Sequence, residues 1–174
     1  MSLQKLWEKY RQETVFNYSV LPKELRKKGE CLELDARCMI VSRGEFPHWI
    51  YFILEGTVTG IREYADGNEY SYFQLDKQNG SIGLLEILAR KDRYIATIVS
   101  TTKVKLLRIE AEVIYEAIME DKSLLRRSMS LLAEDLYQRS GKEGILYYFQ
   151  GIDRVRYYLT SYYEEHREDA ENGK

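Results

Sequence analysis

An anion-binding turn is the first chemistry that this sequence offers. The segment from Gly80 to Thr97 holds a second glycine, Gly83, then a short apolar run, and then Arg93 ahead of another apolar segment. Backbone N–H groups at a glycine turn that opens a helix attract negative charge, and an arginine guanidinium can form two parallel hydrogen bonds with a phosphate. The segment therefore predicts a site for a small anion.

Metal and catalytic chemistry have little support in the sequence. Only His48 and His166 could join the two cysteines, Cys31 and Cys38, whereas a structural metal site usually has four converging ligands. Two reduced thiols are the simpler interpretation. No paired carboxylates and no nucleophile with its base stand out, so we expect no enzyme. A cupin-like enzyme, which needs several converging histidines or carboxylates, is the weakest alternative.

The composition is typical of a soluble globular chain. The 174 residues are 44% hydrophobic and 31% charged, and the formal net charge is -2. This balance argues against a large nucleic-acid surface on the chain as given. No apolar run approaches the roughly 18 residues of a membrane-spanning helix, and no signal peptide is visible. We therefore expect a cytoplasmic protein without a membrane partner.

Helices and then short strands must position the predicted anion site. Residues 3–28 have helical periodicity, with a second short helix that begins at Pro22. Short runs rich in β-branched and aromatic residues follow, and Asp66-Gly67 is typical of a hairpin turn. Many short strands with close turns predict a jelly roll or a sandwich. The expected strands are Cys31–Leu34, Met39–Ser42, Trp49–Leu54, Thr57–Tyr64, Glu69–Leu75, Ile95–Ser100 and Lys103–Ile109.

A helical period returns after Ile109. Residues 113–118 form a short helix, and Asp121 is the expected N-cap of a long helix from Lys122 toward Phe149. About 28 residues span about 42 Å, more than the β domain needs for cover. We favour a dimer helix related by two-fold symmetry over a helix packed on its own domain. A heptad seam marks the expected interface, formed by Leu125, Met129, Leu132, Leu136, Arg139, Glu143 and Leu146.

A last amphipathic helix is expected after the break at Gly151. Val155, Tyr158, Leu159 and Tyr162 share one of its faces. The tail from residue 164 to residue 174 is polar and acidic, so we expect it to be frayed or disordered.

The order of these parts resembles the effector half of the CRP/FNR (catabolite activator-like) family of bacterial transcriptional regulators. The motifs that carry the resemblance are Val41-Ser42-Arg43-Gly44-Glu45, the strand–turn–strand from Ile50 to Val58, and the cassette from Gly80 to Thr97. The resemblance implies an α+β protein with N-terminal helices, a cyclic-nucleotide-binding-type β-roll (a double-stranded jelly roll), a long dimerisation helix and one further short helix. The implied divisions are residues 1–120, 121–150 and 151–174, the last being the start of a DNA-binding domain.

The resemblance also implies a ligand site shared between the cassette and the long helix. The residues that match it are Gly83, Leu84, Leu85, Arg93, Tyr94, Arg139 and Ser140. In family members that bind cyclic AMP, a glutamate that contacts the ribose stands where this chain has Leu84. A ribose hydroxyl without its partner costs about 1–3 kcal/mol, or roughly ten- to a hundredfold in affinity. Tyr94 and Ile95 could also fill the pocket.

We therefore expect no tight binding of cyclic AMP, while another small anion, or no ligand, stays open. Two of the implied ligand residues also have simpler interpretations. Arg93 could form an ion pair with Asp92 or Glu86, and Arg139 could pair with Glu143 or across the dimer seam.

The expected function is effector sensing and dimerisation in a transcriptional regulator. The resemblance implies a homodimer that controls DNA binding through a helix-turn-helix, with RNA polymerase as a further partner. That helix-turn-helix would follow the last short helix and is absent from this chain, so we expect no specific DNA binding by the chain as given. The alternative is a stand-alone cyclic-nucleotide-type regulatory module that acts on a protein partner.

Overall fold

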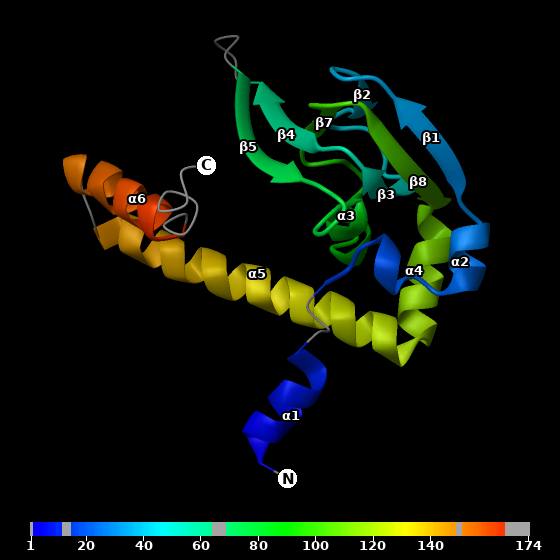
Figure 1. Ribbon diagram of the computed structural model, residues 1–174, viewed down its shortest axis with the longest axis horizontal. Helices are drawn as coiled ribbons and strands as arrows, with labels where there is room; N and C mark the ends of the chain where they lie inside the picture. Colours follow the sequence, from blue (N-terminus) through cyan, green and yellow to red (C-terminus); the bar gives the residue numbers. More distant parts are fainter. Residues whose placement is uncertain (1, 12–14, 64–68, 149–150, 166–174) are drawn as a thin grey trace. The chain divides into compact units, whose positions relative to one another are not determined.

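Two antiparallel sheets of four strands each build the N-terminal part of the described chain (Figure 1). The computed structural model describes residues 2–11, 15–63, 69–148 and 151–165. The chain forms two compact units, residues 1–131 and 132–174. The boundary between them lies inside the long helix α5 (Lys122–Tyr148). The domain limits that the sequence predicted, after residues 120 and 150, stay predictions.

The strands of each sheet come from distant parts of the chain, as in a jelly roll. One sheet has the order β1-β8-β3-β6 and consists of β1 (Glu30–Leu34), β3 (Trp49–Glu55), β6 (Ser81–Ile82) and β8 (Val104–Glu110). The other has the order β2-β7-β4-β5 and consists of β2 (Met39–Val41), β4 (Val58–Glu63), β5 (Glu69–Leu75) and β7 (Thr97–Ser100). The predicted jelly roll is confirmed.

The seven predicted strands all occur, with ends that agree within two residues. The predicted hairpin turn at Asp66-Gly67 lies outside the described residues, but β4 and β5 on either side of it pair in antiparallel fashion. Strand β6 was not predicted, because two residues between two glycines are too short to show a period of two.

Strand β3 is the central element of the roll because both of its faces are buried. Ile50 and Phe52 point into a core that β3 shares with the helices, while Tyr51 and Ile53 point into the core between the two sheets. A strand covered on both faces is expected to be apolar throughout, as the sequence WIYFIL of β3 is. The same division continues on its neighbour β8, where Leu107 faces the helices.

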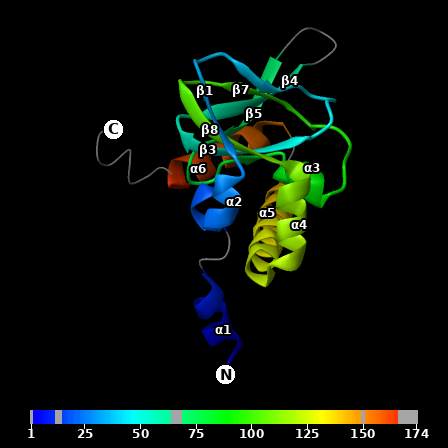
Figure 2. The same cartoon turned by 90° about the vertical axis from the view of Figure 1, so that its right-hand side faces the viewer.

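Two helices that contact β8 pack on the outer face of the β3 sheet. Figure 2 shows α2 (Lys23–Lys27) and α4 (Ala111–Glu120) on the same side of the sheets, and both contact β8. The other helices are α1 (Leu3–Tyr10), the short 3-10 helix η2 (Tyr18–Val20), α3 (Leu84–Leu88) and α6 (Ile152–Glu165). Every helix in the described ranges is too short or too polar to cross a membrane.

The prediction that residues 3–28 are helical is only partly correct. Helix α1 ends at Tyr10, and after residues 12–14, which lie outside the described ranges, the chain makes only η2 and α2. The buried side chain of Asn17 accepts a hydrogen bond from the Ser19 amide and donates to the carbonyl oxygens of Lys77 and Gln78. These bonds fix the segment to the turn after β5, and a continuous helix could not form them.

Helix α5 begins as predicted and has two different faces. Oδ1 of Asp121 accepts hydrogen bonds from the amides of Ser123 and Leu124, at 2.7 and 3.2 Å, so Asp121 is the N-cap. Leu124 and Ser128 are buried against the roll. On the adjacent face, about 100° around the helix, the predicted seam residues Leu125, Met129 and Leu136 are exposed, and Leu132 is half-buried.

Several predictions for the C-terminal part fall on residues that the structure does not describe. The heptad seam includes Glu143 and Leu146, whose side chains are among these. The predicted disordered tail also lies outside the described residues beyond Glu165, where α6 ends. The apolar face predicted for α6 is exposed and includes Val155 and Leu159.

Replacing Phe52 by alanine should lower the unfolding free energy by about 3–5 kcal/mol. Phe52 is fully buried, and its ring centroid lies 6.3 Å from that of Phe16, so truncation leaves a cavity between β3 and the helix layer. Urea denaturation followed by circular dichroism measures the change. Ile95→Ala, at a side chain that is 58% exposed, is the control and should stay within about 0.5 kcal/mol of the wild type. A similarly small loss for Phe52→Ala would show that this core is wrongly described.

Candidate functional site

Gly83 makes the sharp turn from β6 into α3 at the start of the predicted anion site. Its φ is +90°, in the left-handed region that favours glycine. A Cβ atom at this position would lie 2.8 Å from the carbonyl oxygen of Trp49 and 2.9 Å from Cδ1 of Ile50. The close approach that requires glycine here is therefore an approach to the protein's own strand β3.

The side chain of Tyr94 fills the space beside Gly83. It is 5% exposed, and its hydroxyl donates a hydrogen bond of 2.9 Å to the carbonyl oxygen of Trp49. Its backbone is held as well, because its amide donates to the Glu45 carbonyl and its carbonyl accepts from the Gly44 amide. Burial raises the pKa of the Tyr94 hydroxyl well above its ordinary value of 10, and the nearby Tyr51 and Glu86 raise it further. Tyr94 is thus a neutral hydrogen-bond donor at physiological pH.

Arg93, the predicted anion ligand, projects into solvent. Its side chain is 74% exposed, and its Nε lies 3.8 Å from Oδ1 of Asp92, which is one of the two ion pairs that the sequence suggested. The other candidate, Glu86, is buried instead, and its Oε1 accepts a hydrogen bond of 3.2 Å from the Ile95 amide. Glu86 therefore ties the end of the cassette back to α3, a role that spacing alone did not indicate.

The other predicted ligand residues differ in burial, and they belong to both compact units. Leu84 is buried in the core with Ile50 and Phe52, on the side of the helices, whereas Leu85 is exposed. Arg139 and Ser140 lie on α5 in the C-terminal unit, and both are exposed. Nε of Arg139 lies 2.9 Å from Oδ2 of Asp135, one helical turn earlier. The role of all these residues in ligand binding stays a prediction.

A cavity of about 330 Å³ lies against Tyr94 inside the roll. Its lining includes a carboxylate, Glu45, and the buried Tyr51, and it contains no lysine or arginine. Burial raises the pKa of the Tyr51 hydroxyl, while the Arg108 guanidinium opposes that shift. With His48 as its only basic side chain and the carboxylate of Glu45 in the same lining, this cavity is poorly suited to the small anion that the sequence predicted.

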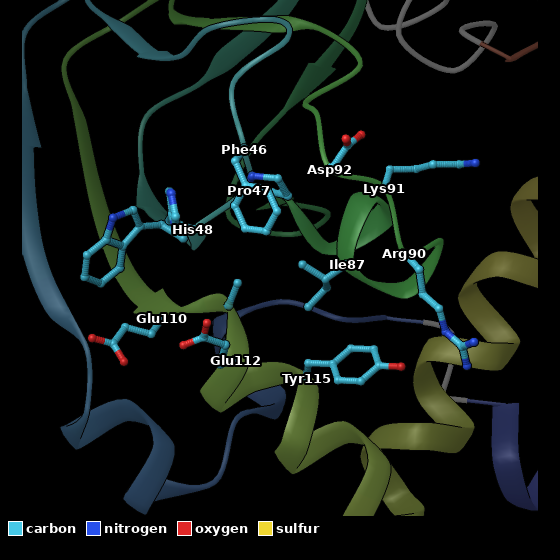
Figure 3. Close-up of a pocket in the computed structure, with 12 residues that line it drawn as sticks. Phe46, Pro47, His48, Ile87, Arg90, Lys91, Asp92, Glu110, Glu112 and Tyr115 are labelled. Atoms are coloured by element: carbon cyan, nitrogen blue, oxygen red, sulfur yellow. The ribbon is translucent and has the colours of Figure 1, made fainter.

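A larger cavity of about 540 Å³ lies between the β2–β3 loop, α3 with the loop after it, and the start of α4 (Figure 3). Sequence reasoning missed it, because a cavity depends on how separate segments pack. Ile87, Arg90, Lys91 and Asp92 belong to the predicted cassette, but the other lining residues lie outside the motifs that the sequence offered. The lining residues are Phe46, Pro47, His48, Trp49, Ile87, Arg90, Lys91, Asp92, Glu110, Ala111, Glu112 and Tyr115.

Metal ligands do not converge anywhere in the described part of the chain. No group of three or more His, Cys, Asp or Glu side chains there could hold a metal ion. Both cysteines are free thiols, with Cys31 exposed and Cys38 half-buried.

The family model named "cyclic nucleotide-binding domain" matches residues 31–121 of this chain. No curated protein matches the chain. A transcriptional regulator from Thermotoga maritima has a similar structure, with a TM-score of 0.63 at 20% identity over 71% of this chain and 95% of that chain.

Two further solved structures are similar at the same level. The sensor domain of the transcriptional regulator DNR from Pseudomonas aeruginosa has a TM-score of 0.61 at 20% identity, over 81% of this chain and 95% of that one. The catabolite activator protein of Thermus thermophilus has a TM-score of 0.62 at 18% identity, over 74% of this chain and 61% of that one. These likenesses confirm that the fold is the one the sequence resemblance implied.

The unfolding free energy should fall as the pH rises above 10, and Tyr94 should account for part of the fall. Above pH 10 the unfolded chain releases the tyrosine proton while the folded protein retains it, which costs up to about 1.4 kcal/mol per pH unit. Below pH 10 both states are protonated and this group contributes no slope. Tyr94→Phe should reduce the slope, and losing its hydrogen bond should cost about 1 kcal/mol at neutral pH.

Urea denaturation across this pH range measures both effects. Tyr137→Phe, at an exposed tyrosine on α5, is the control and should retain the wild-type slope. An unchanged slope in Tyr94→Phe would show that the Tyr94 hydroxyl is not shielded from solvent.

Proposed function

Because the chain belongs to the cyclic nucleotide-binding domain family, we propose that it is the effector-sensing and dimerisation part of a bacterial transcriptional regulator of the CRP/FNR type. The two faces of α5 are the observation that carries this proposal. Leu124 and Ser128 anchor the helix in the core of the roll, while Leu125, Met129 and Leu136 form an apolar stripe on its exposed face. A stripe of this kind on a 27-residue helix is suited to pairing with a second copy.

The proposed effector is a small molecule. Because the Tyr94 ring fills the space beside Gly83, binding at the cassette would require this ring to move. A cyclic nucleotide or another small anion could reach the backbone at Gly83 only after the Tyr94 ring had left its place. Its apparent affinity would then fall by the fraction of molecules in which Tyr94 is displaced. The core position of Leu84 and the outward direction of Arg93 add to this penalty.

The proposed output is control of DNA binding through a helix-turn-helix that would follow α6. The exposed apolar face of α6, which includes Ile152, Val155 and Leu159, would then be covered by that domain. RNA polymerase is the further partner that this proposal implies.

Cyclic AMP should bind weakly to the wild-type protein. A ligand at 100 times its dissociation constant stabilises the folded state by about 2.7 kcal/mol, whereas one present at its dissociation constant contributes only about 0.4 kcal/mol. At millimolar cyclic AMP we expect the unfolding free energy to rise by no more than about 0.4 kcal/mol. Urea denaturation with and without the nucleotide measures this change. Inorganic phosphate at the same concentration controls for charge alone. A gain near the larger value would show that Tyr94 and Leu84 do not obstruct the cassette.

Leu136→Glu should convert a dimer to monomers without unfolding the protein. The side chain is 66% exposed, so the change should alter the stability of the isolated chain by no more than about 0.5 kcal/mol. A charge in the apolar seam of each copy would oppose pairing. Sedimentation velocity over a concentration series measures the association.

Gln138→Glu is the matched control for this experiment. It places the same charge two residues on, about 200° around the helix and therefore on the opposite face, and it should still allow a dimer. A wild-type protein that stays monomeric at every concentration would favour the alternative, a stand-alone regulatory module that acts on a protein partner.

A further inference from the structure

We propose that the 540 Å³ cavity between the β2–β3 loop, α3 and α4 binds a small amphoteric molecule that carries an ammonium group, a carboxylate and an apolar body. An aromatic amino acid is the simplest example of this chemistry. The proposal rests on the proposed sensor function, since it assigns that sensor a ligand and a site outside the cassette turn at Gly83.

The apolar body of the ligand is matched by the walls of the cavity. Phe46, Ile87 and Tyr115 surround one space in Figure 3, each from a different segment of the chain. The Phe46 side chain lines this cavity and is 55% exposed, so the cavity is open to solvent on this side. A volume of this size and a mainly apolar wall with a few charged groups are typical of small-molecule sites.

The charged groups of the ligand are matched by carboxylates and an arginine on opposite sides of the cavity. In Figure 3, Glu110 and Glu112 lie on one side, and Arg90 lies on the other. None of these three side chains forms an ion pair or hydrogen bond within the described part of the chain. Acidic side chains are favourable at the first turn of a helix, which accounts for the two glutamates but not for the arginine. The opposed arginine favours a ligand with both signs of charge.

The backbone of Arg90 gives an independent reason to assign it a role. Its φ is +54°, its amide donates to the Ile87 carbonyl, and the next amide, of Lys91, donates to the Glu86 carbonyl. This pattern ends a helix with a residue in the left-handed conformation, which is usually glycine. An arginine here is strained, and strain of this kind gathers at ligand sites. Arg90 also lines the cavity, so a role in binding would account for an arginine at this position.

A ligand in this cavity would act on the first turn of α5. Glu112 and Tyr115 lie on α4, and the buried face of the same helix carries Ile114 and Ile118. Those two side chains belong to the same core cluster as Leu124 of α5. Contact at the start of α4 therefore reaches the dimerisation helix through packed side chains.

Isothermal titration calorimetry on the whole chain tests the site with three matched probes. L-phenylalanine carries both charges, 2-phenylethylamine only the ammonium group, and 3-phenylpropionate only the carboxylate. We expect L-phenylalanine to bind at least roughly tenfold more tightly than either partial probe, because each lacks one charge-assisted hydrogen bond. Equal binding of the amine and L-phenylalanine, or no heat from any probe, would overturn the proposal.

Two variants assign the charges to their sides of the cavity. Glu112→Gln should weaken L-phenylalanine roughly tenfold and leave 3-phenylpropionate unchanged. Arg90→Gly should weaken L-phenylalanine to the same extent and leave 2-phenylethylamine unchanged. It should also unfold at a temperature no lower than the wild type, because glycine relieves the left-handed backbone. Weaker binding by a variant that is at least as stable cannot be explained by misfolding.

Controls on two of the elements around the cavity complete the test. Glu116→Gln lies one turn further along α4, and Arg43→Gln lies on the β2–β3 loop that carries Phe46, but neither residue lines the cavity. Both should bind L-phenylalanine as the wild type does, and a loss in either would overturn the assignment. Calorimetry measures ligand binding, whereas sedimentation of Leu136→Glu measures self-association. The ligand proposal and the proposed function can therefore fail separately.

Discussion

Burial of both faces of β3 is the constraint on which the rest of the structure depends. Tyr51 and Ile53 hold the two sheets together, and Ile50 and Phe52 hold the helices on the outer face of the same strand. Any element that contacts the outer face is thereby linked to the interior of the roll through one layer of backbone. The carbonyl oxygen of Trp49, at the start of β3, accepts the hydrogen bond that holds the Tyr94 side chain in place.

The residues of the cassette from Gly83 to Glu86 contribute to the fold itself. Gly83 packs against β3, Leu84 belongs to the helix-side core, and Glu86 closes the loop through the Ile95 amide. Each of these groups is satisfied within the protein. A turn whose polar groups all have partners within the protein stabilises the fold without a bound molecule, whereas Arg90, Glu110 and Glu112 around the larger cavity have no such partners in the described part of the chain.

The sequence alone predicted those strands and helices whose apolar residues repeat with a regular spacing. Alternation and turn residues predicted seven strands, and Asp121 marked the start of α5. Two-residue β6 lacks a period, and the bonds from Asn17 to the carbonyls of Lys77 and Gln78 join segments some 60 residues apart. The site was harder, because Arg93 and Tyr94 are neighbours that point in opposite directions. Spacing in the sequence cannot decide which of two adjacent side chains is buried, since that depends on the space beside β3 in the folded protein.

The junction between α4 and α5 has a mechanical consequence. Asp121 is the single non-helical residue between Glu120 and Lys122, with φ -93° and ψ 110°. The direction of α5 therefore depends on the torsions of one capping residue and on the packing of Leu124 and Ser128 in the roll. Over 27 residues the helix is a lever of about 40 Å, so a rotation of about 10° at Asp121 would move its far end by roughly 7 Å. The same rotation would shift the buried Leu124 and Ser128, so their packing decides how far the helix can turn.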